Sequence, residues 1–159
     1  MQTTFSVVVN ADMTLSEAEL ADDAVLASVR PRLLGRNEFY GSIDITHGEQ
    51  QFSLKDDLPP LVLSLCFAAP PKIGAAQSAT IQLASGPGVI RLLPEGGLVR
   101  ITRKDHPDRL FPAQELGDSL LACGQRFVTF FAALTAGEED WQDAREALQS
   151  TAAALSPPR

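Results

Sequence analysis

Few residues of this 159-residue chain have the types and spacing that catalysis requires. There is no glycine-rich loop ending in Lys-Ser or Lys-Thr, no Gly-x-Ser-x-Gly elbow and no His-Glu-x-x-His pair, the patterns that hold phosphates, a nucleophilic serine or zinc. The stretch Gly86-Pro87-Gly88 supplies the backbone angles of a hairpin turn rather than a phosphate cradle. We therefore predict no catalytic residue, no cofactor and no enzyme activity.

Metal-ligating side chains are also scattered along the chain. Structural zinc needs four closely placed ligands, whereas Cys66 and Cys123 are far apart in the sequence and are expected to be buried free thiols. His106 stands between Asp105 and Asp108, and two carboxylates can raise the pKa of a histidine or contribute to a weak metal site. A solvated, charge-balanced loop is the expectation that we retain. We predict no metal site.

Arginines offer a better candidate for binding. A turn at residues 94–97 predicts a hairpin that places Arg91 and Arg100 near each other on one face. Like charges opposite each other in a sheet are unfavourable by up to about 1 kcal/mol, so an acid is expected beside them: Asp44, an anionic ligand or a partner's carboxylate. Together with Tyr40 the pair forms a candidate anion-binding site, and two arginines that point into water are the alternative.

The net charge of −7 is unevenly distributed. Residues 1–29 hold five acids and no base, residues 61–112 hold six bases and three acids, and residues 113–159 hold three bases and seven acids. This disfavours nucleic acid, because phosphate affinity needs clustered Lys and Arg. Acidic segments suit a basic protein partner, since charge complementarity speeds encounter and sets specificity; the outer faces of two amphipathic helices are the alternative. The candidate partner-binding residues are Asp12, Glu17, Asp22, Asp23, Glu138, Glu139, Asp143 and Glu146.

Strands that position these residues are predicted where β-branched and apolar residues run together or alternate. These segments are residues 5–9, 39–46, 52–54, 80–84, 89–93 and 98–103. The second and third segments should form a hairpin that turns at residues 47–49.

Helices are predicted where apolar residues recur at helical spacing. These segments are residues 25–33, 58–67, 116–134 and 141–155. Thr14 with Glu17, or Ser16 with Glu19, has the spacing of a capping box at the start of the first helix. Proline is expected to stop or kink that helix at Pro31, and the pair at residues 70–71 is expected to end the second helix.

The resulting order, β-α-β-β-α-β-β-β-α-α, predicts an α+β fold. We expect a largely antiparallel sheet of about five to six strands with helices packed on one face. Residues 1–155 are expected to form a single domain, followed by a frayed tail at residues 156–159. The chain starts without a basic, apolar leader, and its longest apolar run is too short to cross a bilayer, so we expect no signal peptide and no membrane contact.

Three stretches resemble the small acidic immunity proteins of bacterial polymorphic toxin systems. They are the acidic segment at residues 11–23, the block FYGSIDITHGEQQFSLKDDLPPLVLSLC at residues 39–66 and the helix LLACGQRFVTFFAAL at residues 120–134. The resemblance implies a cytoplasmic α+β protein that binds and blocks a cognate toxin. The chain is also similar to the dimeric secretion chaperones of type III systems, but those begin with a helix, whereas residues 5–9 predict a strand.

Three functional hypotheses follow. The first is a non-enzymatic, immunity-type inhibitor whose acidic surface occludes a basic toxin domain. The second is a secretion or assembly chaperone that forms a homodimer through the apolar helix at residues 58–67 or through an exposed sheet edge. The third is a small-ligand or anion-binding domain that uses Arg91, Arg100 and Tyr40.

Overall fold

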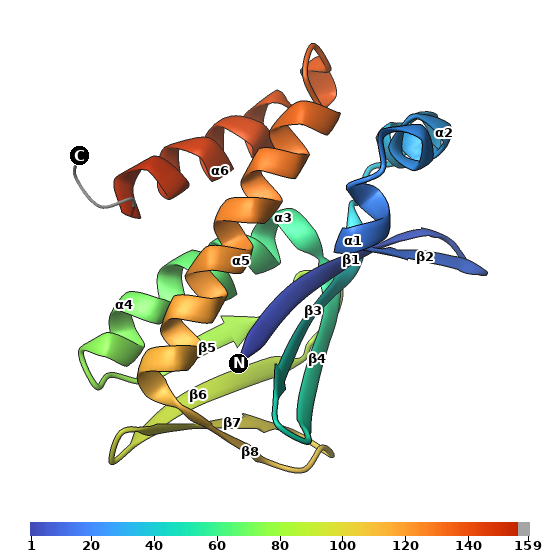
Figure 1. Ribbon diagram of the computed structural model, residues 1–159. Helices are drawn as coiled ribbons and strands as arrows, with labels where there is room; N and C mark the ends of the chain where they lie inside the picture. Colours follow the sequence, from blue (N-terminus) through green and yellow to red (C-terminus); the bar gives the residue numbers. More distant parts are fainter. Residues whose placement is uncertain (156–159) are drawn as a thin grey trace.

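The computed structural model describes residues 1–155, so the expected fraying of residues 156–159 lies outside the described residues. The α+β class is confirmed, but the prediction of one sheet of five to six strands is wrong. Eight strands form two separate four-stranded antiparallel sheets. In Figure 1 the first sheet stands upright beside the long helix α5, and the second sheet lies below them.

The first sheet has the strand order β2-β1-β3-β4. Its strands are β1 (Gln2–Asn10), β2 (Met13–Ser16), β3 (Tyr40–His47) and β4 (Gln50–Asp57). The predicted hairpin between β3 and β4 is confirmed and turns at Gly48, whose φ of 61° suits glycine. Sequence patterns did not indicate β2, because it is only four residues long and lacks an alternating run.

The second sheet is a meander in the order β5-β6-β7-β8. Its strands are β5 (Ala79–Gln82), β6 (Val89–Glu95), β7 (Leu98–Arg103) and β8 (Arg109–Pro112). The first three were predicted, although β5 ends earlier than expected because the next N–H groups, of Ala84 and Ser85, bond the Asp56 carboxylate instead of β6. β8 was not predicted, since RLFP is short and contains a proline.

Two short helices follow β2: α1 (Glu17–Leu20) and α2 (Asp23–Leu34). Ser16 and Glu19 form the capping box of α1, which confirms one of the two predicted registers, and Asp22 caps α2. Pro31 lies inside α2, which continues to Leu34. Of the predicted stop or kink at Pro31, the stop is excluded, and burial of Leu33 beyond the proline shows that tertiary packing stabilises this last turn.

The second helical rod contains α3 (Leu58–Leu61), the π-helix η1 (Val62–Ala68) and α4 (Ala69–Gly74). It passes through the proline pair at residues 70–71, so the prediction that these prolines end the helix is wrong. They occupy the first turn of α4, where a proline loses no hydrogen bond of its own helix. Upstream, the wider π turns pair the Ala69 N–H with the Ser64 carbonyl.

The C-terminal third is helical, as expected: α5 (Ala113–Leu134), the 3-10 helix η2 (Glu139–Trp141) and α6 (Gln142–Leu155). α5 packs against β1 and against η1, α4 and α6, so it is the centre of the core. Phe127 on α5 meets Phe5 edge to face with ring centroids 5.2 Å apart. Such aromatic pairs add about 0.5–1.5 kcal/mol beyond burial alone.

The apolar helix that the homodimer hypothesis invoked is already occupied within one chain. Leu58, Leu61, Val62 and Leu65 are at most 1% exposed. These apolar side chains are therefore not available to a second copy, because α3 packs against β3 and β4, and η1 packs against α5 and α6. A homodimer stays a prediction, and it would need a different interface.

Candidate functional site

The three residues of the predicted anion site are not brought together: Tyr40 lines a cavity whose described lining includes neither Arg91 nor Arg100. Arg91 and Arg100 do share the face of β6 and β7 that points away from the core, but Arg91 pairs with Thr102 and Arg100 with Leu93, so the two arginines are diagonal neighbours. Arg100 forms two hydrogen bonds with Glu95: its Nε donates to Oε1 at 2.8 Å and its Nη2 donates to Oε2 at 3.0 Å. This hydrogen bond lowers the pKa of Glu95 below its ordinary value.

The acid expected beside Arg100 is present, but it is not Asp44. Besides Glu95, Asp108 lies 3.6 Å from Arg100. Asp44 belongs to the other sheet, where it accepts hydrogen bonds from Ser42 Oγ at 3.0 Å and Ser53 Oγ at 2.5 Å. The negative charge beside Arg100 thus comes from Glu95, at the end of β6, and from Asp108, in the loop between β7 and β8.

Tyr40 lies in a different site, a cavity of about 520 Å³ between the two sheets. Lys55 of β4 and Arg103 of β7 line this cavity together with Tyr40 of β3. Ser53 of β4 also lines it, and the segment between β5 and β6 forms the remaining wall with Leu83, Ser85, Gly86, Pro87 and Gly88. Two cationic residues and a tyrosine from three strands therefore line one cavity, and the lining that the structure describes includes no carboxylate.

Asp56 holds the loop of this cavity in place. Its carboxylate, 1% exposed, accepts the N–H groups of Ala84 at 2.7 Å and of Ser85 at 2.9 Å. Burial by itself raises the pKa of Asp56, but hydrogen bonds from the Ser85 hydroxyl and from the Ala84, Asp57 and Ser85 backbone outweigh burial and lower it below its ordinary value. Asp56 therefore stays ionised and links the first sheet to the loop of the second.

The structure identifies Lys55, Arg103 and Asp56 as site residues that the sequence analysis did not select. Lys55 follows Ser53 on the exposed side of an alternating strand, so its face was predictable. Arg103 continues the side of β7 that bears the buried Val99 and Ile101, which places it at the end of the core face. No sequence signal indicated that these two strands meet.

Three of the eight predicted partner-binding acids have partners that connect or cap helices. Glu17 Oε1 accepts from Arg126 Nε at 2.5 Å, Asp22 accepts the N–H groups that begin α2, and Glu138 lies 3.6 Å from Arg30. These acids connect or cap helices. Their exposed oxygens contribute to the surface charge, but their first role is structural.

The other predicted acids are exposed. Among the residues that the structure describes, Asp23, Glu139 and Asp143 have no hydrogen bond from their side chains and no salt bridge. Glu146 accepts from Gln142 Nε2 at 2.8 Å, and Asp12 lies in the turn between β1 and β2, where its N–H bonds Asn10.

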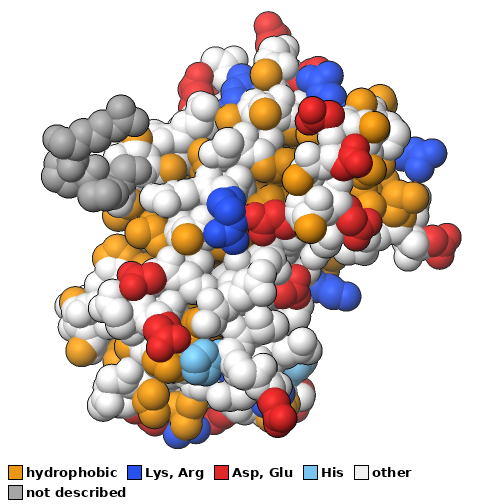
Figure 2. Space-filling view, in the orientation of Figure 1, with side chains coloured by type: hydrophobic (Ala, Val, Ile, Leu, Met, Phe, Trp, Pro, Cys, Tyr) orange, Lys and Arg blue, Asp and Glu red, His pale blue; other side chains and the backbone are white. Residues whose placement is uncertain are grey.

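The structure brings the two acidic segments of the chain together at one end of the molecule. Arg30 of α2 bonds Glu138 and also donates to the Leu134 carbonyl at 3.0 Å, and Trp141 Nε1 donates to the Leu34 carbonyl at 3.3 Å. Figure 2 shows carboxylates over this upper region with a few cations between them. We call residues 12–36 and 138–146 the acidic end; they hold ten acids and four arginines.

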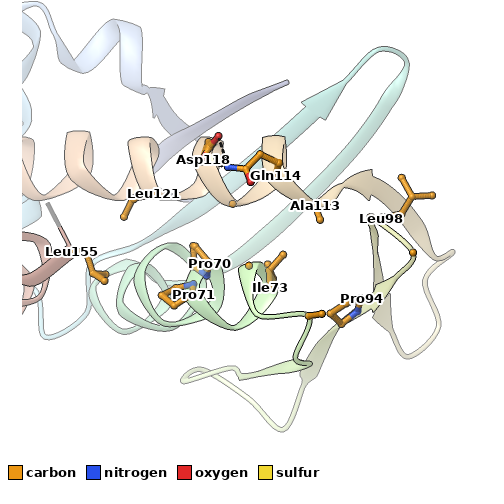
Figure 3. Close-up of a pocket in the computed structure, with 15 residues that line it drawn as sticks. Pro70, Pro71, Ile73, Pro94, Leu98, Ala113, Gln114, Asp118, Leu121 and Leu155 are labelled. Atoms are coloured by element: carbon orange, nitrogen blue, oxygen red, sulfur yellow. Dashed lines mark hydrogen bonds between the residues drawn. The ribbon is translucent and has the colours of Figure 1, made fainter. Parts of the chain in front are cut away.

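A second, larger cavity is an apolar groove of about 670 Å³ that follows α5 (Figure 3). Pro70, Pro71 and Ile73 of the α4 segment lie beneath α5, with Leu155 at one end and Leu98 at the other. The charged lining residue is Asp118, which is bonded by the neighbouring Gln114 at 3.1 Å. The described lining of the groove is thus mainly apolar, with Asp118 as its one ionisable side chain.

The cysteines are buried free thiols, as predicted. They lie side by side between η1 and α5, where the hydrogen bond of the Cys66 thiol with Cys123 and its burial raise the pKa of Cys66 well above its ordinary value. His106 is exposed and its Nδ1 lies 3.0 Å from the Lys104 carbonyl. Within residues 1–155 no group of three or more His, Cys, Asp or Glu side chains is arranged to hold a metal ion.

Among the helices described, none has the length and apolar character needed to cross a membrane. Comparisons of the chain with protein-family models, with curated proteins and with solved structures gave no match.

Proposed function

We propose that this protein is a non-enzymatic, immunity-type inhibitor that binds a basic toxin domain through its acidic end. The observation that carries the proposal is the joining of two acidic segments, remote in sequence, by the contacts of Arg30 and Trp141. The exposed carboxylates of Asp23, Glu139 and Asp143 are then available to a partner. Inhibition would work by occlusion, because a partner's basic cleft would be covered and its substrate excluded.

The arginines of the acidic end do not cancel its charge. Arg30, Arg36 and Arg145 donate to backbone carbonyls, which fixes their guanidinium groups against the protein. With four arginines against ten acids, the potential of this end stays negative. Such a field speeds encounter with a cationic surface and weakens as salt is added.

The test is a charge reversal with a matched control. Affinity capture from the native host would supply the partner, and the affinity of each variant would then be measured by calorimetry at low and high salt. The variant Asp23→Lys/Asp143→Lys changes the acidic end, and Glu49→Lys/Asp118→Lys makes the same change of net charge at exposed acids elsewhere.

We expect the first variant to lose at least tenfold in affinity at low salt and to show a flatter salt dependence, because close charge pairs across interfaces contribute more than 1 kcal/mol. The control variant should bind nearly as the parent does. Equal affinities for both variants would refute binding through the acidic end, and a partner that is not basic would refute the charge argument.

A further inference from the structure

The cavity beside Tyr40 has the features of a small anion site, and it is independent of the acidic end. Lys55 and Arg103 reach it from different sheets, and among the residues described neither has a side-chain hydrogen bond or an ion pair. Arg103 is half-buried, so its side chain is partly shielded from water. The Tyr40 hydroxyl is a third donor without a partner among the described residues.

Nearby carboxylates are engaged elsewhere. Asp44 is on the same face of the first sheet but is bonded by the Ser42 and Ser53 hydroxyls. Asp57 pairs with Tyr40 in the strand register, yet its Oδ1 accepts the Phe39 N–H at 2.9 Å. The donors that line the cavity therefore have no acceptor of their own within the described part of the chain.

The wall opposite the strands is fixed before any ligand arrives. Asp56 binds two successive N–H groups of the loop, and the Leu83 N–H bonds the Gly88 carbonyl at 3.0 Å, so the loop is closed at both ends. A site whose geometry is already held loses less entropy on binding than a mobile loop would.

We propose that this cavity binds the phosphate group of a small phosphate monoester, with Lys55, Arg103 and Tyr40 as its ligands. A phosphate dianion matches two cations, and its oxygens accept from the guanidinium fork, the ammonium and the phenol at once. A carboxylate carries half that charge. The volume of about 520 Å³ exceeds that of a phosphate ion and lies within the range of sites for small organic ligands.

The chain offers a single reporter for this site. Tyr40 is its only tyrosine, so ring-labelled tyrosine gives one set of NMR signals from the cavity itself. Phenyl phosphate, inorganic phosphate, benzoate and phenol would be titrated while these signals are followed. We expect phenyl phosphate to shift them with saturation, inorganic phosphate to do so more weakly, and benzoate to bind at least tenfold more weakly than phenyl phosphate.

Variants assign the binding to the named side chains. Lys55→Ala and Arg103→Ala should each weaken phenyl phosphate about tenfold or more, since each removes a charge-assisted hydrogen bond. Arg91→Ala is the matched control, because it removes an exposed arginine from the opposite face of the same sheet. Its affinity should stay within twofold of the parent.

Several results would overturn the assignment. Phenol binding as tightly as phenyl phosphate would make the cavity an apolar site, and benzoate binding as tightly would remove the preference for phosphate. Absence of saturation for both phosphates, or equal losses in Arg91→Ala and Arg103→Ala, would show that the cavity is not a phosphate site. If Arg103→Ala fails to fold, Lys55→Gln provides the same comparison from the exposed edge of the other sheet.

Discussion

Asp56→Ala is the substitution that most directly tests how the two sheets are joined. The side chain of Asp56 is 1% exposed, and its oxygens accept the Ala84 N–H at 2.7 Å and the Ser85 N–H at 2.9 Å. Alanine removes both acceptors and leaves the two N–H groups without a partner. We expect lower stability and a loosened loop between β5 and β6.

The size of the loss follows from these contacts. Each hydrogen bond to a charged group contributes about 1.5–3 kcal/mol. Ala84 and Ser85 are exposed residues, however, so in the variant water would bond part of the time to the two N–H groups that lose the carboxylate. We therefore expect a loss of about 2–4 kcal/mol in the free energy of unfolding. For a domain whose total is about 5–15 kcal/mol, this is a substantial fraction.

The assay is urea unfolding followed by the fluorescence of Trp141, the only tryptophan, which is buried and contacts Phe39 with ring centroids 6.0 Å apart. With a slope of about 1–3 kcal/mol/M, the midpoint should fall by roughly 1–2 M. Asp118→Ala is the control, because that carboxylate is exposed and bonded only by Gln114, and it should change stability by less than about 0.5 kcal/mol. A loss of less than about 0.5 kcal/mol in Asp56→Ala would refute the role of this carboxylate as a link between the sheets.

The pH dependence gives an independent check on Asp56. Its pKa in the folded protein is lower than the ordinary value of 3.8, so its stabilising contribution is fully present above pH 3.8 and is lost as the pH falls through the folded pKa. Asp56→Asn cannot titrate at this position. The difference in unfolding free energy between the parent and Asp56→Asn should therefore be constant near neutral pH and shrink below pH 3.8, and a difference that grows on acidification would contradict the assignment.

The remaining predictions concern the contacts of α5. A Cβ at Gly117 would lie 3.9 Å from Pro70 Cβ, so Gly117→Ala should be neutral or stabilise by up to about 1 kcal/mol, whereas at Gly124 it would lie 2.8 Å from Cys66 Cβ and Gly124→Ala should cost about 1–3 kcal/mol. Equal urea midpoints for the two variants would contradict this packing. Cys66 and Cys123 should resist a thiol reagent until the protein unfolds, because the thiolate is disfavoured at Cys66 and both thiols are buried; rapid labelling of the folded protein would show that this part of the core opens.

The sequence predicted best the elements whose patterns are long and regular. The alternation of residues 39–46 and the apolar stripe of residues 116–134 correspond to β3 and α5 within a few residues. The four-residue strands β2 and β8 were not found, because so short a segment shows neither period clearly. Partition into two sheets was also not predictable, since pairing between distant strands leaves no local signal in the chain.

For the candidate site, sequence patterns predicted faces but not neighbours. The hairpin correctly placed Arg91 and Arg100 on one face, and Glu95, the last residue of β6 before the turn, binds Arg100. Tyr40 was grouped with these arginines because no pattern shows which strands of different sheets meet. The structure instead places it with Lys55 and Arg103, whose separation in the sequence concealed the relationship.

Charge along the chain is ordered by the fold into two separate environments. The acidic N-terminal and C-terminal segments meet because α2 contacts the connection between α5 and α6, whereas the basic middle of the chain forms the second sheet, whose Arg103 meets Lys55 of the first. A basic protein and a small anion would therefore bind at different places and respond oppositely to charge. Reversal of acids at the acidic end should lower the affinity for the protein partner and leave the response of the Tyr40 signals to phenyl phosphate unchanged. Lys55→Ala should weaken phenyl phosphate binding and leave the affinity for the protein partner unchanged. Each proposal can therefore fail without the other.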